Sequence, residues 1–95
     1  MTGREQTTCI TIAVASRRTG LAPRTVRRYI RRQLVSQTLT EAELAELRRI
    51  RRLTALGVNL AGVEIILRMR RRIEELQAEV ERLERIVASR EVWNR

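Results

Sequence analysis

The 95-residue sequence contains no histidine, no aspartate and no lysine, and its two aromatic residues are Tyr29 and Trp93. Without histidine the chain lacks the side chain that most often acts as a general base near neutral pH. One cysteine with no histidine or aspartate cannot build a zinc site, so we expect neither a metal ion nor a cofactor. The composition therefore indicates a protein that is not an enzyme.

The single cysteine, Cys9, cannot form a disulfide framework, which fits a reducing cytoplasm. We expect its side chain to be a small buried hydrophobe. The uncharged stretches are too short to span a bilayer, and the first residues lack the apolar core of a signal peptide. The sequence thus predicts a cytoplasmic protein without a membrane partner.

Positive charge is concentrated in one segment. The chain has 20 basic and 11 acidic residues, a net charge of +9, and residues 17–32 hold seven arginines and no acid. The segments on either side are nearly balanced. A GC-rich coding sequence explains why every basic residue is arginine and none is lysine. The concentration of positive charge in one segment instead indicates an anionic partner.

Start and stop signals predict two short helices in the first third of the chain. Thr11 is an N-cap for a helix over residues 12–18, and Gly20 supplies its C-terminal stop. Pro23, a residue preferred at the first helical position, opens a second helix that runs to about Arg32. The four residues between these helices, 19–22, have the length of a helix-turn-helix turn.

Two longer helices are predicted after residue 40. Thr40 and Glu43 match a capping box, so the third helix should begin at Glu41, and Gly57 should end it. Asn59 can cap a fourth helix that meets no proline. The apolar residues of the third helix share one face, which we expect in the core: Leu44, Leu47, Ile50, Leu53 and Leu56.

The fourth helix, roughly 50 Å long at 1.5 Å per residue, exceeds what the small preceding head can cover. We expect Leu60, Val63 and Leu67 to pack on the head. Beyond them, apolar residues alternate at steps of three and four, as the a and d positions of a coiled coil do. This pattern predicts self-association through a seam of Ile66, Met69, Ile73, Leu76, Val80, Leu83 and Val87.

The residues alone leave the orientation of this coiled coil open. β-Branched residues at a and leucine at d favour a parallel dimer. The flanking charges favour an antiparallel dimer, in which g positions face g positions and e positions face e positions. Arg72 and Glu79 both occupy g, and Arg70 and Glu84 both occupy e, so each arginine could meet a glutamate of the partner. Exposed charge pairs of this kind contribute only a few tenths of a kcal/mol each.

The second helix has one apolar and one basic face. Val26, Tyr29 and Ile30 share the face that belongs in the core, and the opposite arginines suit the DNA major groove, where guanidinium bridges guanine O6 and N7. Arg17 and Arg18 would lie near flanking phosphates. No aromatic platform for single strands or RNA is present. The predicted contacts to double-stranded DNA are Arg17, Arg18, Arg24, Thr25, Arg27, Arg28, Arg31 and Arg32.

Residues 10–29, ITIAVASRRTGLAPRTVRRY, resemble the head of MerR-family transcriptional regulators. Residues 56–63, LGVNLAGV, look like the stretch that opens the dimerisation helix in the heat-shock repressor (HspR) and chaperone-modulator (CbpM) branches. The resemblance covers roughly residues 10–88. It implies an all-α fold with a winged-helix-derived, MerR-like helix-turn-helix head and a long dimerisation helix that forms an antiparallel coiled coil.

The resemblance further implies binding to palindromic promoter DNA that is often bent. It places Arg24, Thr25 and Arg28 towards bases and Arg27 and Arg31 towards the backbone. An antiparallel coil would also bring Trp93 to the head of the partner subunit.

The sequence departs from the family pattern in three ways. The family usually has an aromatic residue at the position of Arg28 and an acid at that of Ile30. Its Gly- and Arg-containing wing is replaced by a direct connection over residues 34–40. The sequence ends just after the coil, so we expect no small-molecule effector.

We therefore expect a flexible N-terminus over residues 1–8, a helix-turn-helix DNA-binding head over 9–57 and a coiled-coil dimerisation helix over 58–95. The expected function is that of a homodimeric, sequence-specific transcriptional regulator, associated with the nucleoid, that acts by promoter occupancy and bending. The alternative is a modulator that binds a DnaJ-type co-chaperone, which residues 59–62 and the lost wing favour. A third hypothesis is an excisionase-like architectural protein.

Overall fold

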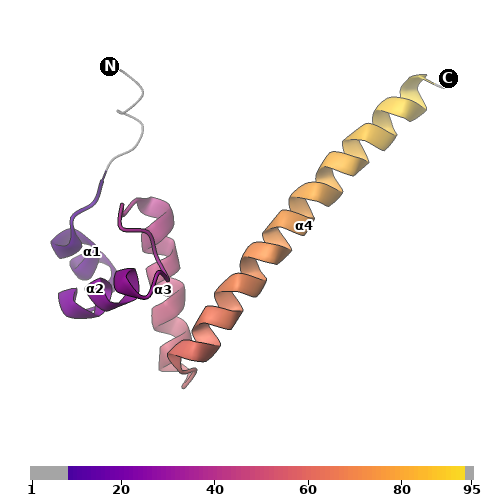
Figure 1. The fold of residues 1–95 in the computed structure, drawn as a ribbon. Helices are drawn as coiled ribbons and strands as arrows, with labels where there is room; N and C mark the ends of the chain where they lie inside the picture. Colours follow the sequence, from indigo (N-terminus) through magenta and orange to yellow (C-terminus); the bar gives the residue numbers. More distant parts are fainter. Residues whose placement is uncertain (1–8, 94–95) are drawn as a thin grey trace, which may run out of the picture. The chain divides into compact units, whose positions relative to one another are not determined.

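A computed structural model describes residues 9–93, and every regular element in that range is an α-helix. The predicted N-terminal segment, residues 1–8, lies outside the described residues. The helices are α1 (Ile12–Thr19), α2 (Pro23–Arg31), α3 (Glu41–Ala55) and α4 (Leu60–Trp93) (Figure 1). The predicted all-α fold, with a helix-turn-helix head and a long C-terminal helix, is confirmed.

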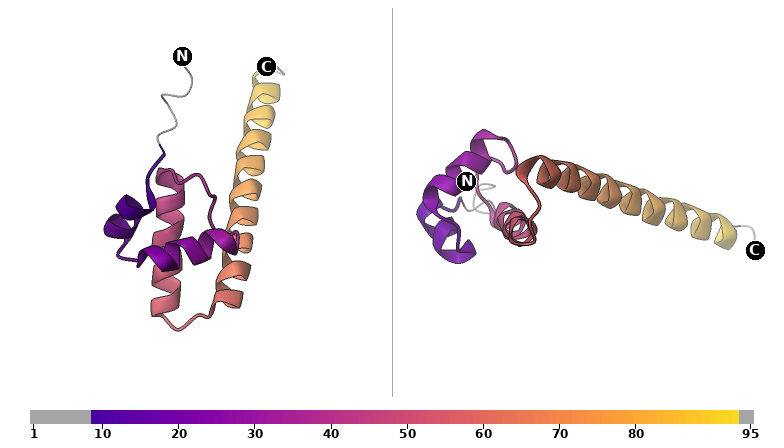
Figure 2. Two further views of the ribbon diagram at one scale, coloured as in Figure 1. Left: turned by 60° about the vertical axis from the view of Figure 1, so that its left-hand side comes forward. Right: turned by 90° about the horizontal axis from the view of Figure 1, so that it is seen from below.

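The chain divides into two compact units, one that ends at Val63 and one that begins at Glu64. In the first unit α1 contacts both α2 and α3 (Figure 2). The segment before α1 joins this unit through a hydrogen bond from the Ile10 N–H to the Leu39 carbonyl at 2.8 Å. The buried side chains of the unit are Ala15, Thr19, Val26, Tyr29, Leu34, Val35, Leu39, Leu44, Leu47, Ile50 and Val63.

Side-chain and backbone caps set three of the helix boundaries as predicted. The Thr11 hydroxyl accepts from the Val14 N–H at 3.2 Å at the start of α1, and the Asn59 side chain accepts from the Gly62 N–H at 2.8 Å at the start of α4. Gly20 ends α1 with a φ of 79°, a left-handed conformation that glycine adopts readily.

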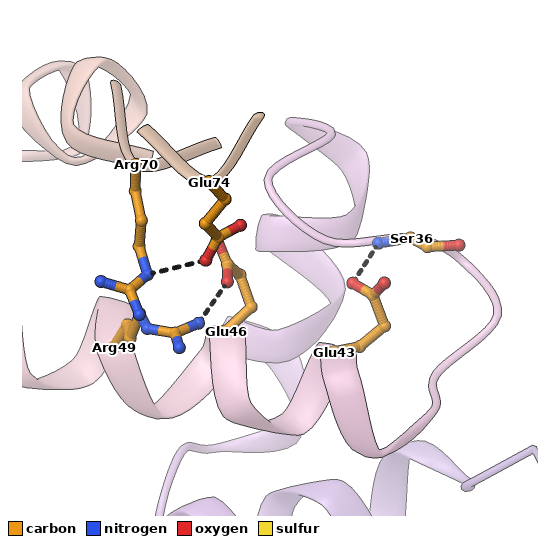
Figure 3. Close-up of polar contacts among 6 residues, drawn as sticks. All are labelled: Ser36, Glu43, Glu46, Arg49, Arg70 and Glu74. Carbon is orange, nitrogen blue, oxygen red and sulfur yellow. Dashed lines mark hydrogen bonds and ion pairs between the residues drawn. The ribbon is translucent and has the colours of Figure 1, made fainter. Parts of the chain in front are cut away.

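The predicted capping box of α3 is wrong, although α3 does begin at Glu41. Thr40 makes no side-chain cap hydrogen bond. The Glu43 carboxylate accepts instead from the Ser36 N–H at 2.9 Å (Figure 3). The reason is tertiary: the connection before α3 brings the Ser36 N–H to this carboxylate, which bonds to it.

The connection between α2 and α3 takes the place of a wing, and it contains no strand. Its side chains Leu34, Val35 and Leu39 are buried. The chain leaves α2 through Gln33, which has a φ of 62°. This segment is therefore part of the core of the head and does not project as an arm.

Two predicted core positions of the head are exposed. Leu56 is 79% exposed, because residues spaced by three drift around a helix and Leu56, about two and a half turns after the buried Leu47, lies on the opposite side. Cys9 is exposed too, since it precedes the first helix and lies outside the packed segment. Leu53 and Ile30 are half-buried.

The second unit is the α4 helix from Glu64 onward. Its seam residues are all exposed in the single chain, from 37% for Ile66 to 58% for Met69. Three residues near the start of α4 are expected to pack on the head. Val63 and Leu67 are fully buried, and Leu60 is half-buried. Within residues 9–93, no helix combines the length and the apolarity that a bilayer crossing needs.

Candidate nucleic-acid interface

The helix α2 has the two faces that its sequence predicts. Val26 and Tyr29 are buried, Ile30 is half-buried, and Thr25 is half-buried at the edge. Arg32 is exposed and follows the last residue of α2 as its C-cap. The outward face consists of exposed basic side chains: Arg24, Arg27, Arg28 and Arg31.

We call this set of four the α2 arginine face. Within residues 9–93 none of the four forms an ion pair. The guanidinium of Arg28 lies 5.8 Å from the ring centre of Tyr29, within cation–π range. The face therefore presents positive charge that no described carboxylate neutralises.

The two arginines at the end of α1 differ from each other. Arg17 is exposed and makes no ion pair within the described residues. Arg18 is held by Glu41 at the start of α3 through two hydrogen bonds of 2.8 and 2.9 Å. Hydrogen bonding and charge attraction between the two groups raise the pKa of Arg18 and lower that of Glu41.

This pair changes the expectation for Arg18. Its guanidinium already has a carboxylate partner, so a phosphate would have to compete with Glu41 for it. The two residues are 23 positions apart in the sequence. The absence of acids from residues 17–32 therefore gave no sign of this contact.

Hydrogen bonds fix the turn that joins α1 to α2. The Thr19 hydroxyl donates to the Ala15 carbonyl at 2.7 Å and accepts from the Leu21 N–H at 3.3 Å. The Ser16 hydroxyl donates to the Leu21 carbonyl. These bonds tie Leu21, two residues before α2, to the last turn of α1, and they hold the α2 arginine face in one orientation relative to α1.

A side chain from α3 completes the turn. Arg51 donates from Nη1 to the Thr19 carbonyl at 3.1 Å. Its guanidinium lies over Gly20, where an added Cβ would come within 2.8 Å of Nη1. Sequence reasoning did not assign this role to Arg51, because the two residues it contacts are more than 30 positions away and no local pattern relates them.

The exposed seam of α4 is bordered by shallow grooves between successive side chains. One groove is lined by Ile66, Met69 and Ile73, and the next by Ile73, Leu76 and Val80, each with polar neighbours. Outside the seam, ion pairs such as Arg70 with Glu74 at 3.6 Å lie along the same helix (Figure 3). The surface has the alternation of ridges and holes that a second helix can fill.

Comparison with protein families gives a match for this chain. The family model described as MerR HTH family regulatory protein matches residues 20–85 of the chain. The match begins in the turn before α2 and includes α2, α3 and most of α4. Neither the comparison with curated proteins nor the comparison with solved structures yields a match.

Proposed function

Because the chain belongs to the MerR helix-turn-helix family, whose members are non-enzymatic DNA-binding regulators of transcription, we propose that it acts as a homodimer on palindromic promoter DNA. The observation that carries this proposal is the α2 arginine face, four exposed guanidiniums without a described acidic partner. A helix of this kind, about 13 Å long at 1.5 Å per residue, fits within the major groove.

The proposal gives the arginines of the head different roles. Arg24, Thr25 and Arg28 contact bases, and bidentate contacts from guanidinium to guanine supply the sequence preference. Arg27 and Arg31 contact the backbone, as Arg17 does from the end of α1. Arg32 lies at the edge of this set, and Arg18 contributes only to the extent that phosphate displaces Glu41.

The buried connection between α2 and α3 limits the contact surface. Since Leu34, Val35 and Leu39 are anchored in the core, this segment offers no projecting arm for an adjacent groove or backbone. Affinity must therefore depend on α2 and the end of α1. Sequence-dependent bending of the DNA would bring more backbone to this small surface, at a deformation cost that depends on the sequence.

Dimerisation doubles the contact area. The exposed seam of α4 would be covered by the same helix of a second copy, in an antiparallel coiled coil. A two-fold dimer reads two half-sites one helical turn of DNA apart, about 34 Å, or a multiple of that spacing. The regulator then works by occupying, and bending, the promoter.

The test uses a duplex selected from a random-sequence pool and titrated by fluorescence anisotropy. Arg24→Ala and Arg28→Ala should each lower the affinity by about 1–3 kcal/mol per half-site, which is roughly 2–6 kcal/mol for a dimer that loses one contact in each subunit. Arg85→Ala is the matched control, since it removes the same charge from an exposed position of α4 that makes no ion pair within residues 9–93. Its effect should be much smaller.

Two results would reject the proposal. One is the absence of duplex binding by the folded protein. The other is an equal loss of affinity in all three variants, which would show that net charge and not the α2 arginine face determines binding.

The second candidate function is that of a chaperone modulator that binds a DnaJ-type co-chaperone. The observation that favours it is the closed connection between α2 and α3, which removes a DNA-contacting element and leaves a compact head. A pull-down with a DnaJ-like protein separates the two functions. Capture that excess duplex DNA does not reduce, and that Arg24→Ala does not weaken, would support the modulator.

A further inference from the structure

A second row of side chains runs along α4 beside the seam. In the heptad that places the seam at a and d, the g positions are Ile65, Arg72, Glu79 and Ile86. Ile65 and Ile86 are 52% and 42% exposed, although neither belongs to the seam. We call these four residues the g row.

The g row is self-complementary when its direction is reversed. Arg72 and Glu79, of opposite charge, stand one heptad apart at its centre, and an isoleucine stands one heptad outside each of them. Read from either end, the order is apolar, charged, charged, apolar, and reversal places the cation against the anion. In antiparallel coiled coils the g positions of one helix face the g positions of the other.

We propose that α4 pairs with α4 of a second copy in one antiparallel register, in which Ile65 contacts the partner's Ile86 and Arg72 pairs with the partner's Glu79. The proposal rests on the homodimer proposed above and specifies its interface. Two-fold symmetry makes every contact occur twice. The isoleucines would thereby be buried, which explains why a surface helix carries them outside its seam.

Six of the seven seam residues form layers in the same register. With Arg72 level with the partner's Glu79, Ile73 stacks on the partner's Leu76. In the next layer away from the centre of the coiled coil, Met69 stacks on the partner's Val80. In the layer after that, Ile66 stacks on the partner's Leu83. Every layer pairs an a residue with a d residue, and all of these side chains are exposed in the single chain.

Other antiparallel registers bring residues of the g row into unfavourable contacts. A shift of one heptad in one direction opposes Glu79 to the partner's Glu79 and Arg72 to the partner's Ile86. A shift in the other direction opposes Arg72 to the partner's Arg72. Like charges that face each other destabilise a coiled coil, and an isoleucine opposite a charge remains partly hydrated.

The parallel arrangement also fails, because there each g residue faces the e residue of the following heptad. Ile65 would then face the partner's Arg70, and Glu79 would face the partner's Glu84. In the proposed register the e position Arg70 lies nearest the partner's Gln77, which is neutral. Of these arrangements, only the proposed one matches apolar with apolar residues and cation with anion.

The ion pairs within α4 do not oppose this arrangement. Arg72 contacts Glu75 at 3.2 Å, and Glu79 pairs with Arg82. All four side chains are at least half exposed, and exposed pairs of this kind are weak. A charge on a facing helix can therefore share these groups with their neighbours in the same helix.

The experiment is site-specific cross-linking in a Cys9→Ser background with a short bismaleimide. The Ile65→Cys and Ile86→Cys variants are refolded together and separately, and their helix content is checked by circular dichroism. The mixture should give a cross-linked heterodimer, and each variant alone should stay uncross-linked. When Glu79→Cys replaces Ile86→Cys, the product should fall several-fold, because the thiol lies about 10 Å from the proposed position.

A spin label on Arg85→Cys in the same background, outside the interface, measures the orientation without altering the seam. The label-to-label distance should exceed about 30 Å in the proposed dimer, and it would be close to 20 Å, the width of two helices, in a parallel one. The short distance, or cross-linking of Ile65→Cys alone, would overturn the proposal.

Sedimentation of the wild-type protein separates failure of this inference from failure of the proposed function. A monomer would refute both the homodimer and the register. A dimer without the predicted cross-link, or with an equal yield from Glu79→Cys, would refute the register alone and leave DNA binding by the dimer standing.

Discussion

The contact between Arg51 and the helix-turn-helix turn predicts an energetic coupling that can be measured. Replacing Gly20 by alanine puts a Cβ 2.8 Å from Arg51 Nη1 and 2.9 Å from its Cζ. The guanidinium can move away, but it would then lose its hydrogen bond to the Thr19 carbonyl at 3.1 Å. Gly57→Ala is the matched control, since Gly57 also has a positive φ, of 94°, and beyond its two chain neighbours no atom of the described residues lies within 4 Å of its added Cβ.

The expected costs follow from these geometries. An alanine held in a left-handed conformation costs about 1–2 kcal/mol, and this term applies to both glycines. Loss of the Arg51 hydrogen bond adds about 0.5–1.5 kcal/mol at Gly20 alone. We therefore expect Gly20→Ala to lower the free energy of unfolding by about 1.5–3.5 kcal/mol and Gly57→Ala to lower it by about 1–2 kcal/mol.

The assay is urea unfolding followed by circular dichroism at a fixed protein concentration, since an oligomer's apparent stability depends on concentration. Both glycine variants are measured in the wild-type and the Arg51→Ala backgrounds. Without the guanidinium, the cost of Gly20→Ala should fall to that of Gly57→Ala, whose own cost should not change. If Gly20→Ala costs the same in both backgrounds, the coupling between Arg51 and the turn does not exist.

Two further predictions concern stability. Leu47→Ala should lower the free energy of unfolding by about 2–5 kcal/mol, because the side chain is fully buried. Leu56→Ala should change it by less than about 0.5 kcal/mol, because the side chain is 79% exposed, and equal effects in urea unfolding would contradict the assignment of the buried face of α3. The lowered pKa of Glu41 predicts stabilisation that is complete above the ordinary glutamate pKa and is lost as pH falls through the lowered one. The stability of the wild type minus that of Glu41→Gln should accordingly be positive at neutral pH and shrink in acid, and a difference that does not change with pH would disprove the role of the Arg18–Glu41 pair.

The boundaries and faces of the helices could be predicted because their signals are local. Thr11, Gly20 and Asn59 act within four residues of their own positions, and the structure shows each of them at the predicted helix end. The basic and apolar sides of α2 follow from helical periodicity alone, with Val26 and Tyr29 buried as expected.

The failures arose where a distant residue competes with a local signal. Glu43 has the spacing of a capping box but bonds to Ser36, which the fold of the connection brings near. Arg18 belongs to an acid-free stretch of sequence but contacts Glu41 of a later helix. Leu56 shows a different limit: residues at steps of three count as one face, yet at 3.6 residues per turn they drift around the helix and leave Leu56 exposed, opposite the buried Leu47.

The central claim, that the arginines of α2 and of the end of α1 bind duplex DNA, is tested most directly by the salt dependence of the binding constant. If Arg17, Arg27 and Arg31 of each subunit contact phosphates, a plot of log K against log salt concentration should have a slope of about −5. Arg27→Ala should make this slope shallower by about 2, one contact per subunit, while Arg85→Ala leaves it nearly unchanged. A slope near zero, or the same slope in the wild type and Arg27→Ala, would contradict the claim.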